Sequence, residues 1–153
     1  MKPDLSINYA IDIVKTSEYI KVVDVWEASV RATHYFLSEQ DIQHFKPLIL
    51  NEYLAAVELR CIRGQDDVIL GFLGVADLKI EMLFVDPRAM KQGIGKMLTI
   101  HAIDNMAARQ VDVNEDNMQA VGFYEHLGFK VMSRSRLDAL GKPFPILHML
   151  LND

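Results

Sequence analysis

The stretch Ile80–Leu98 constrains this 153-residue chain more than any other. A largely apolar segment, Ile80–Val85, runs into Asp86-Pro87, which predicts a strand that ends in a turn. Gly93 and Gly95 follow at the start of a helical pattern, and glycine allows the backbone to approach a ligand closely. The first N–H groups of a helix are unpaired and carry partial positive charge, which suits phosphate. The sequence therefore predicts that a cofactor with a diphosphate group binds here.

Composition narrows the class of protein and its partners. The formal net charge is −5, whereas nucleic-acid-binding proteins present a basic surface, so we expect no nucleic-acid partner. Cys61 is the only cysteine, which excludes an internal disulfide and a thiolate metal cluster. We also expect no metal site, and one domain over residues 1–153. The histidines that show no metal-ligand spacing are His44, His101, His126 and His148.

No membrane segment is expected. The longest apolar run, Val68–Ala76, is too short to cross a bilayer and contains two glycines. The first residues, Met1 to Asp4, lack the features of a secretory signal peptide. A single cysteine also indicates a reducing compartment. The sequence therefore predicts a cytoplasmic protein with no membrane partner.

Hydrophobic periodicity and turn residues predict about seven strands and four helices. Ser38 and Asp41 resemble a capping box at the start of the second helix. Asn117 is a suitable N-cap for the last helix, and Gly128 a suitable residue to end it. The expected strands cover residues 5–14, 53–62, 68–75, 78–85, 111–113, 129–132 and 144–151. The expected helices cover residues 17–32 and 38–50, the segment after Gly93, and residues 117–127.

Three motifs follow one another at specific spacings, and together they resemble the GNAT superfamily of acetyl-CoA-dependent N-acetyltransferases. The motifs are VDPRAMKQGIGKML at Val85–Leu98, VDVNEDN at Val111–Asn117 and AVGFYEHLGF at Ala120–Phe129. The resemblance implies a mixed α/β fold with a mostly antiparallel central sheet and helices on both faces. It also implies that strands four and five splay apart into a V that holds acetyl-CoA.

The resemblance further implies which residues contact the cofactor. The strand residues Leu83, Phe84 and Val85 would offer backbone groups to the pantetheine arm and the acetyl carbonyl. Asn117 would contact the arm, and Tyr124 would lie close to the sulfur. The loop that would surround the pyrophosphate consists of Lys91, Gln92, Gly93, Ile94, Gly95 and Lys96. This chain departs from the family at Met90, where Arg or Gln is usual, so Lys91, Gln92 or Lys96 would have to supply that side-chain contact.

Two side chains are candidates for proton transfer. Tyr124 is the predicted general acid, because a phenol stays protonated at pH 7 and can donate to the leaving thiolate. The alternative is a core aromatic residue on an amphipathic helix. Glu81 is the predicted general base, acting directly or through water, because it interrupts an apolar strand that leads to the cofactor loop. The alternatives are an ion pair with Lys79 or an ordinary exposed position.

The acceptor site is expected near the end of the first helix, where polar and aromatic residues gather. Arg31 or His34 could bind a carboxylate and Trp26 could stack on the acceptor, although Trp26 could equally belong to the core. The acceptor amine could be a polyamine or aminoglycoside, an amino acid, a protein N-terminus or a lysine, and the acidic charge slightly favours a cationic small molecule. Transfer of another acyl group, a silent CoA-binding module and a homodimer are further possibilities.

Overall fold

The computed structural model describes residues 9–152, so residues 5–8 of the first predicted strand lie outside it. In the described part, seven strands form one sheet in the order β1-β2-β3-β4-β5-β7-β6. They are β1 (Ile11–Ile13), β2 (Glu58–Arg63), β3 (Ile69–Ala76), β4 (Lys79–Val85), β5 (Gln110–Asn114), β6 (Phe129–Ser135) and β7 (Ile146–Leu151). All neighbouring strands are antiparallel except β4 and β5. The predicted mixed, mostly antiparallel sheet is therefore confirmed.

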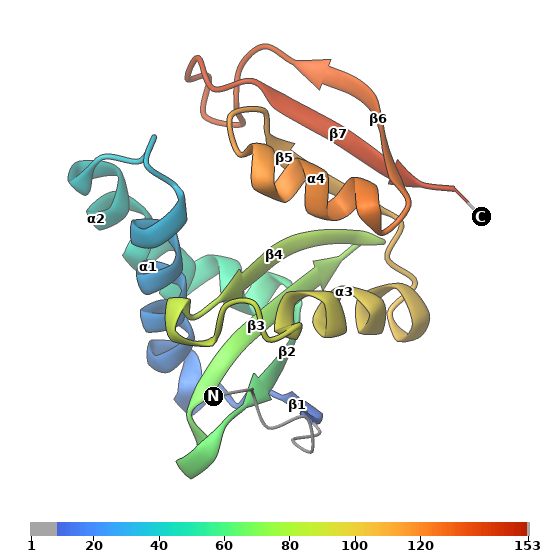
Figure 1. Cartoon of the computed structure of the whole chain (residues 1–153). Coiled ribbons are helices and arrows are strands. Elements are labelled where there is room, and N and C mark those ends of the chain that lie inside the picture. Colours follow the sequence, from blue (N-terminus) through green and yellow to red (C-terminus); the bar gives the residue numbers. More distant parts are fainter. Residues whose placement is uncertain (1–8, 153) are drawn as a thin grey trace.

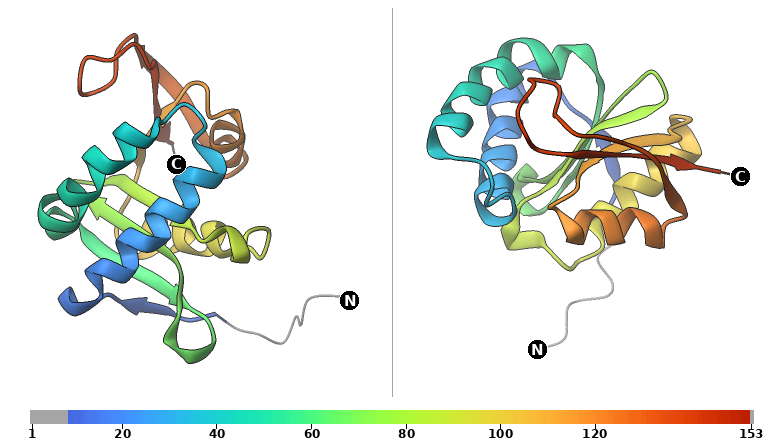
Figure 2. Two further views of the ribbon diagram at one scale, coloured as in Figure 1. Left: turned by 90° about the vertical axis from the view of Figure 1, so that its left-hand side faces the viewer. Right: turned by 90° about the horizontal axis from the view of Figure 1, so that it is seen from above.

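Helices cover both faces of this sheet, as predicted (Figures 1 and 2). They are α1 (Tyr19–Thr33), α2 (Glu39–Leu48), α3 (Ile94–Asn105) and α4 (Met118–His126). Helices α1 and α2 bury Trp26 and Ile42 against one face, together with Phe72 of β3. Helices α3 and α4 bury Ile94 and other apolar residues against the opposite face. No helix of residues 9–152 is long and apolar enough to cross a bilayer.

Strands β4 and β5 diverge after a short parallel contact. Only Lys79 and Ile80 of β4 are in register with β5, opposite Gln110 and Val111. On its other edge, β4 pairs with β3 so that Glu81 is an extra residue between the pairs Ile80–Val75 and Met82–Gly74. Such a bulge bends and twists a strand, which turns the rest of β4 away from β5. The predicted V is therefore confirmed, and the backbone edge of residues 81–85 that faces it lacks a strand partner.

The predicted strand over residues 53–62 is wrong in its first half. Helix α2 contains Pro47 and continues into a π-helical turn, Ile49–Tyr53, and then a 3₁₀ turn, Leu54–Ala56. Proline lacks an N–H group and crowds the preceding turn, so it is costly inside a helix. The chain nevertheless stays helical after Pro47, as a π-helical and then a 3₁₀ turn. Leu54 is fully buried in this arrangement, and β2 begins only at Glu58.

Two loops meet across the open end of the V. The ring of Phe36, between α1 and α2, lies 5.8 Å from the ring of Phe144, between β6 and β7. Lys142 Nζ also pairs with the carboxylate of Asp41 at 2.9 Å. Asp41 completes the predicted capping box with Ser38 at the start of α2. We call the contacting segments, residues 36–41 and 142–144, the arch.

Candidate active site

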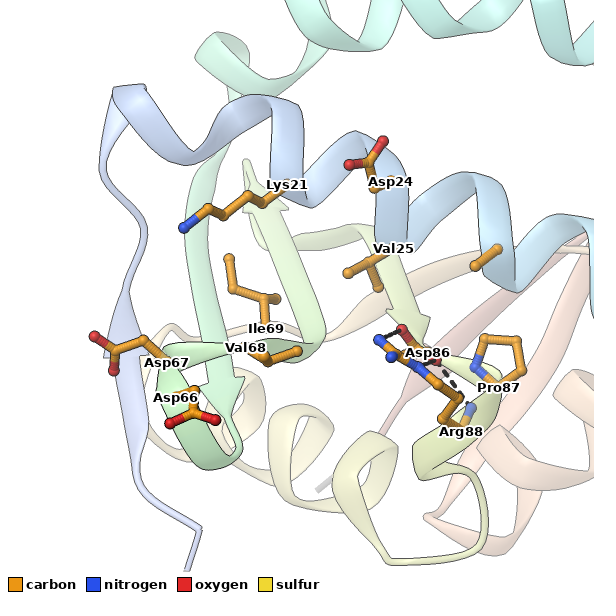
Figure 3. A pocket seen from close by; sticks show the side chains of 11 residues that line it. Lys21, Asp24, Val25, Asp66, Asp67, Val68, Ile69, Asp86, Pro87 and Arg88 are labelled. Atoms are coloured by element: carbon orange, nitrogen blue, oxygen red, sulfur yellow. Dashed lines mark hydrogen bonds and ion pairs between the residues drawn. The ribbon is translucent and has the colours of Figure 1, made fainter.

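A rigid turn directs the chain from β4 into the predicted cofactor loop. The carboxylate of Asp86 accepts a hydrogen bond from the backbone N–H of Arg88 at 2.9 Å and pairs with the Arg88 guanidinium at 2.8 Å. That guanidinium holds the pKa of the buried Asp86 carboxyl below its usual value. Figure 3 shows this pair at the rim of a hollow of about 480 Å³, which α1 and the β2–β3 turn also line. None of the residues predicted to bind cofactor or acceptor lines that hollow.

The start of α3 has the geometry of a phosphate cradle. Gly93, its N-cap, has φ +80°, a conformation that other residues rarely adopt. The first helical hydrogen bond joins Met97 N–H to Gly93 O at 2.9 Å, so the N–H groups of residues 94–96 precede the helical ladder. A Cβ atom at Gly93 would meet nothing within 4 Å. The open space beside these donors fits a diphosphate group.

Ten of the eleven predicted cofactor residues line one cleft of about 360 Å³, which we call the cofactor cleft. They are Leu83, Phe84, Val85, Lys91, Gly93, Ile94, Gly95, Lys96, Asn117 and Tyr124. Met90 lines the cleft as well, so its side chain stands where the family usually has a cation or an amide. Gln92 does not, because it accepts a hydrogen bond from the Tyr9 hydroxyl at 2.6 Å.

Sequence reasoning missed several residues of the cofactor cleft. Helix α4 presents Gln119, Ala120 and Phe123 to it, together with Tyr124. Helical spacing was the signal that could have found them, because positions three and four residues apart share a face. Ala120 lies four residues before Tyr124, and Phe123 lies three residues after Ala120 and four after Gln119. Asn117 caps α4 by accepting from Ala120 N–H at 3.2 Å, as predicted, and also lines the cleft.

Tyr124 points its hydroxyl at open space rather than at a protein partner. Only 6% of the residue is exposed, and its ring packs edge-on against Phe123 and Phe129, with ring centroids 5.1 and 5.5 Å away. Among the described residues, none forms a hydrogen bond with the hydroxyl, and none of their fully buried polar atoms lacks a partner. Burial raises the pKa of Tyr124. The phenol is therefore protonated at neutral pH and free to donate.

Two further spaces adjoin the cofactor cleft, because some of the residues that line it also line them. The first, about 130 Å³, lies between the diverging strands, and we call it the gap; Glu81, Leu83, Asp112, Asn114, Asn117 and Tyr124 are among its lining residues. The second, about 250 Å³, lies on the α1 and α2 side, and we call it the acceptor hollow; Trp26, Phe45, Ile49, Tyr53, Glu81 and Phe84 are among its lining residues. His34 lines the cleft, the gap and the hollow.

The structure brings two of the three predicted acceptor residues to the hollow. Trp26 and His34 line it, although Trp26 is 5% exposed and also belongs to the core. Arg31 does not line it. Its guanidinium pairs with Glu27 at 2.8 Å and with Glu39 at 2.6 Å, linking α1 to the start of α2.

Glu81 has one loose ionic contact. Its carboxylate lies 4.0 Å from Lys79 Nζ, whereas that ammonium group makes a much shorter contact with Asp112. The side chain of Glu81 is 40% exposed and lines both the gap and the acceptor hollow. A carboxylate in this place can attract a cationic amine. The three adjoining spaces offer room for a phosphate-bearing acyl donor on one side of the sheet and for an amine on the other.

Comparison with known proteins agrees with this arrangement. The family described as acetyltransferase (GNAT) domain matches residues 35–144. A protein of Salmonella typhimurium named peptidyl-lysine N-acetyltransferase YjaB is 40% identical over 130 residues, which are 85% of this chain and 89% of that protein.

Solved structures are similar along most of the chain. The solution structure of apo-form YjaB from Escherichia coli has a TM-score of 0.82 and 36% identity, covering 94% of this chain and 97% of that one. PaiA N-acetyltransferase from Thermoplasma acidophilum, determined in complex with coenzyme A, has a TM-score of 0.71 over 95% of this chain and all of its own. At 19% identity, this second likeness shows a shared fold.

Proposed function

This chain belongs to the GNAT family of acetyltransferases, and we propose that it transfers the acetyl group of acetyl-CoA to the side-chain amine of lysine residues in proteins. One observation carries the proposal: the cleft beside the start of α3 and the hollow that Glu81 lines flank the gap between β4 and β5, and both share lining residues with that gap. The relatives named for peptidyl-lysine acetylation match most of the chain and most of their own length, which supports a lysine acceptor.

The chain's own groups would hold the donor in place. The N–H groups of residues 94–96 face the space where a diphosphate fits, and Lys91 and Lys96 add positive charge to the cleft. The unpaired backbone edge of residues 81–85 offers N–H donors for negative charge that builds up on the acetyl oxygen. When bound, acetyl-CoA supplies the acetyl group as a thioester.

Two side chains would handle protons and charge. Tyr124 donates its hydroxyl proton to the leaving sulfur, since it lines both the cofactor cleft and the gap and its hydroxyl is not otherwise engaged. Glu81 attracts the lysine ammonium into the acceptor hollow and takes up a proton through water. Holding both substrates in one reaction space also favours direct attack, because orientation alone can supply up to about 7–11 kcal/mol.

The acceptor is tested with a peptide that has a blocked N-terminus and one internal lysine. We expect the purified protein and acetyl-CoA to add one acetyl group to that lysine, located by mass spectrometry, and to release an equal amount of CoA thiol. The same peptide with arginine in place of lysine is the matched control. A polyamine and free lysine are assayed in parallel, and efficient acetylation of either with none on the peptide would overturn the proposal.

A further inference from the structure

Two residues, His34 and Phe84, line all three spaces of the candidate active site, and only His34 is titratable. His34, the C-cap of α1, lines the cofactor cleft, the gap and the acceptor hollow. Glu81 lines the gap and the hollow but not the cleft, while Tyr124 lines the cleft and the gap but not the hollow. Of these three titratable groups, His34 alone faces both the donor side and the acceptor side.

Hydrogen bonding assigns a role to each ring nitrogen of His34. Thr33 Oγ1 lies 2.8 Å from the carbonyl oxygen of Ser29 and 2.8 Å from His34 Nδ1. A carbonyl oxygen can only accept, so the single hydroxyl proton of Thr33 is donated to Ser29. The second contact then requires Nδ1–H to donate to Thr33 Oγ1. In the neutral ring, Nε2 is then the unprotonated nitrogen, with its lone pair available.

The surroundings of the imidazole suit a neutral base. Its ring lies 5.3 Å from the ring of Phe36 and 6.0 Å from that of Phe84. Burial lowers the pKa of His34 from its ordinary value of 6.5, so the neutral form predominates at pH 7. Glu81 and Asp112 share the gap with it and would stabilise an imidazolium once formed. The other titratable groups that line the three spaces are Lys91, Lys96, Tyr53 and Tyr124.

We propose that His34 is a catalytic residue whose Nε2 atom takes the proton directly from the acceptor amine, with Glu81 receiving that proton afterwards through water. This inference rests on the proposed function. It moves the first proton transfer from Glu81, the general base predicted from the sequence, to His34. Glu81 attracts the cation from solvent, and His34, which also borders the donor cleft, prepares it for attack.

Protons balance as follows over one reaction. The acceptor arrives as an ammonium group, and Nε2 of His34 removes one proton to free the nitrogen lone pair. That lone pair forms the C–N bond while the C–S bond breaks. Sulfur gains a proton from Tyr124, and the nitrogen loses its second proton, which restores the phenol. One proton per acetyl group transferred leaves through His34 and Glu81 to solvent.

The test compares His34→Gln with the control His126→Gln, which replaces an exposed histidine at the end of α4. The assay follows CoA release with the lysine peptide between pH 5.5 and 9, since a lysine titrates near 10.4. For the wild type we expect kcat/KM to decrease at low pH, with a midpoint below about 6.5, the usual pKa of histidine. For His34→Gln we expect kcat/KM to decrease about 10²-fold or more at pH 7. The remaining rate should rise about tenfold per pH unit, because the fraction of neutral amine does. The affinity for acetyl-CoA should be unchanged.

Two further measurements separate chemistry from structure. A peptide α-amine, with a pKa of about 7.7–8.0, is partly neutral at pH 8, so its acetylation should suffer much less than that of lysine. Added imidazole should restore activity to His34→Ala, which a merely structural role would not allow.

The outcomes are distinguishable. If the wild type acetylates no lysine, the proposed function itself fails. If the wild type is active and His34→Gln keeps its rate and its pH profile, His34 is not the base. A third outcome would also overturn the inference: His34→Gln loses activity, imidazole does not restore activity to His34→Ala, and the α-amine is affected as strongly as lysine.

Discussion

Gly71 of β3 sits directly beneath the phosphate cradle, so a single methyl group there should act on cofactor binding. A Cβ atom at Gly71 would lie 2.8 Å from Cγ2 of Ile94, the first residue of α3. Ordinary van der Waals contacts begin near 3.4 Å, so Cγ2 of Ile94 must move away by about 0.6 Å, the difference between the two distances. Cγ2 is attached to a branched Cβ atom, and such side chains have one strongly preferred rotamer in a helix. We therefore expect Gly71→Ala to displace the first turn of α3.

Two magnitudes follow from this displacement. Overpacking of a buried site costs about 1–3 kcal/mol of unfolding free energy, which lowers Tm by about 2–4 °C for each kcal/mol in a chain of this size. A hydrogen bond to a charged group contributes about 1.5–3 kcal/mol. Weakening one backbone bond to phosphate should therefore raise the Kd for acetyl-CoA at least about tenfold.

Gly74→Ala provides the matched control in the same strand. A Cβ atom there would also meet a side-chain methyl group at 2.8 Å, but the methyl belongs to Val57, on the α1 side of the sheet. Both variants should lose similar stability in thermal unfolding, whereas isothermal titration with acetyl-CoA should detect weaker binding only for Gly71→Ala. Wild-type affinity in a folded Gly71→Ala protein, or an equal loss of affinity in Gly74→Ala, would refute the reasoning.

Three other predictions concern single side chains. Tyr124→Phe should keep its Tm, because the hydroxyl has no hydrogen-bond partner among the described residues, and should reduce kcat about 10²- to 10⁴-fold; an unchanged kcat in steady-state assays would remove Tyr124 as the acid. Met90→Arg should lower the Kd for acetyl-CoA about threefold or more, measured by titration in low salt, because it adds a cation to the cleft; weaker binding would contradict a phosphate near this position. Hydrogen bonds from Arg63 lower the pKa of Glu18 from 4.5 to about 2. This ionised pair therefore stabilises the fold above pH 4.5, and its contribution is lost as the pH falls towards 2. In urea titrations, the unfolding free energy of Glu18→Gln should decrease less than that of the wild type as the pH falls from 4.5 towards 2. An equal decrease in both proteins would exclude the pair as a contributor.

Features that act over a few residues were predictable from sequence. The capping box of Ser38 and Asp41, the Asn117 cap and the left-handed Gly93 each depend on neighbours within one helical turn. That the three motifs line one cleft was an expectation of the resemblance to the GNAT superfamily, and the structure places them around that cleft.

Features that depend on packing were not predictable. Leu54 falls within the segment predicted as a strand, yet the chain is still helical there, in spite of Pro47, and buries the Leu54 side chain. No local feature of the sequence predicts that Arg31 pairs with Glu39, because that contact depends on the angle between two helices. The meeting of three spaces at His34 depends on the positions of α1, β4 and α4 together, and no single segment carries that information.

The divergence of β4 and β5, with the arch at its far end, leaves the gap in the middle of the sheet. The cofactor cleft lies on the side of α3 and α4, and the acceptor hollow lies on the side of α1 and α2. If the proposed function holds, the two substrates approach the gap from opposite faces of the sheet, so that CoA and the acetylated lysine can leave in either order.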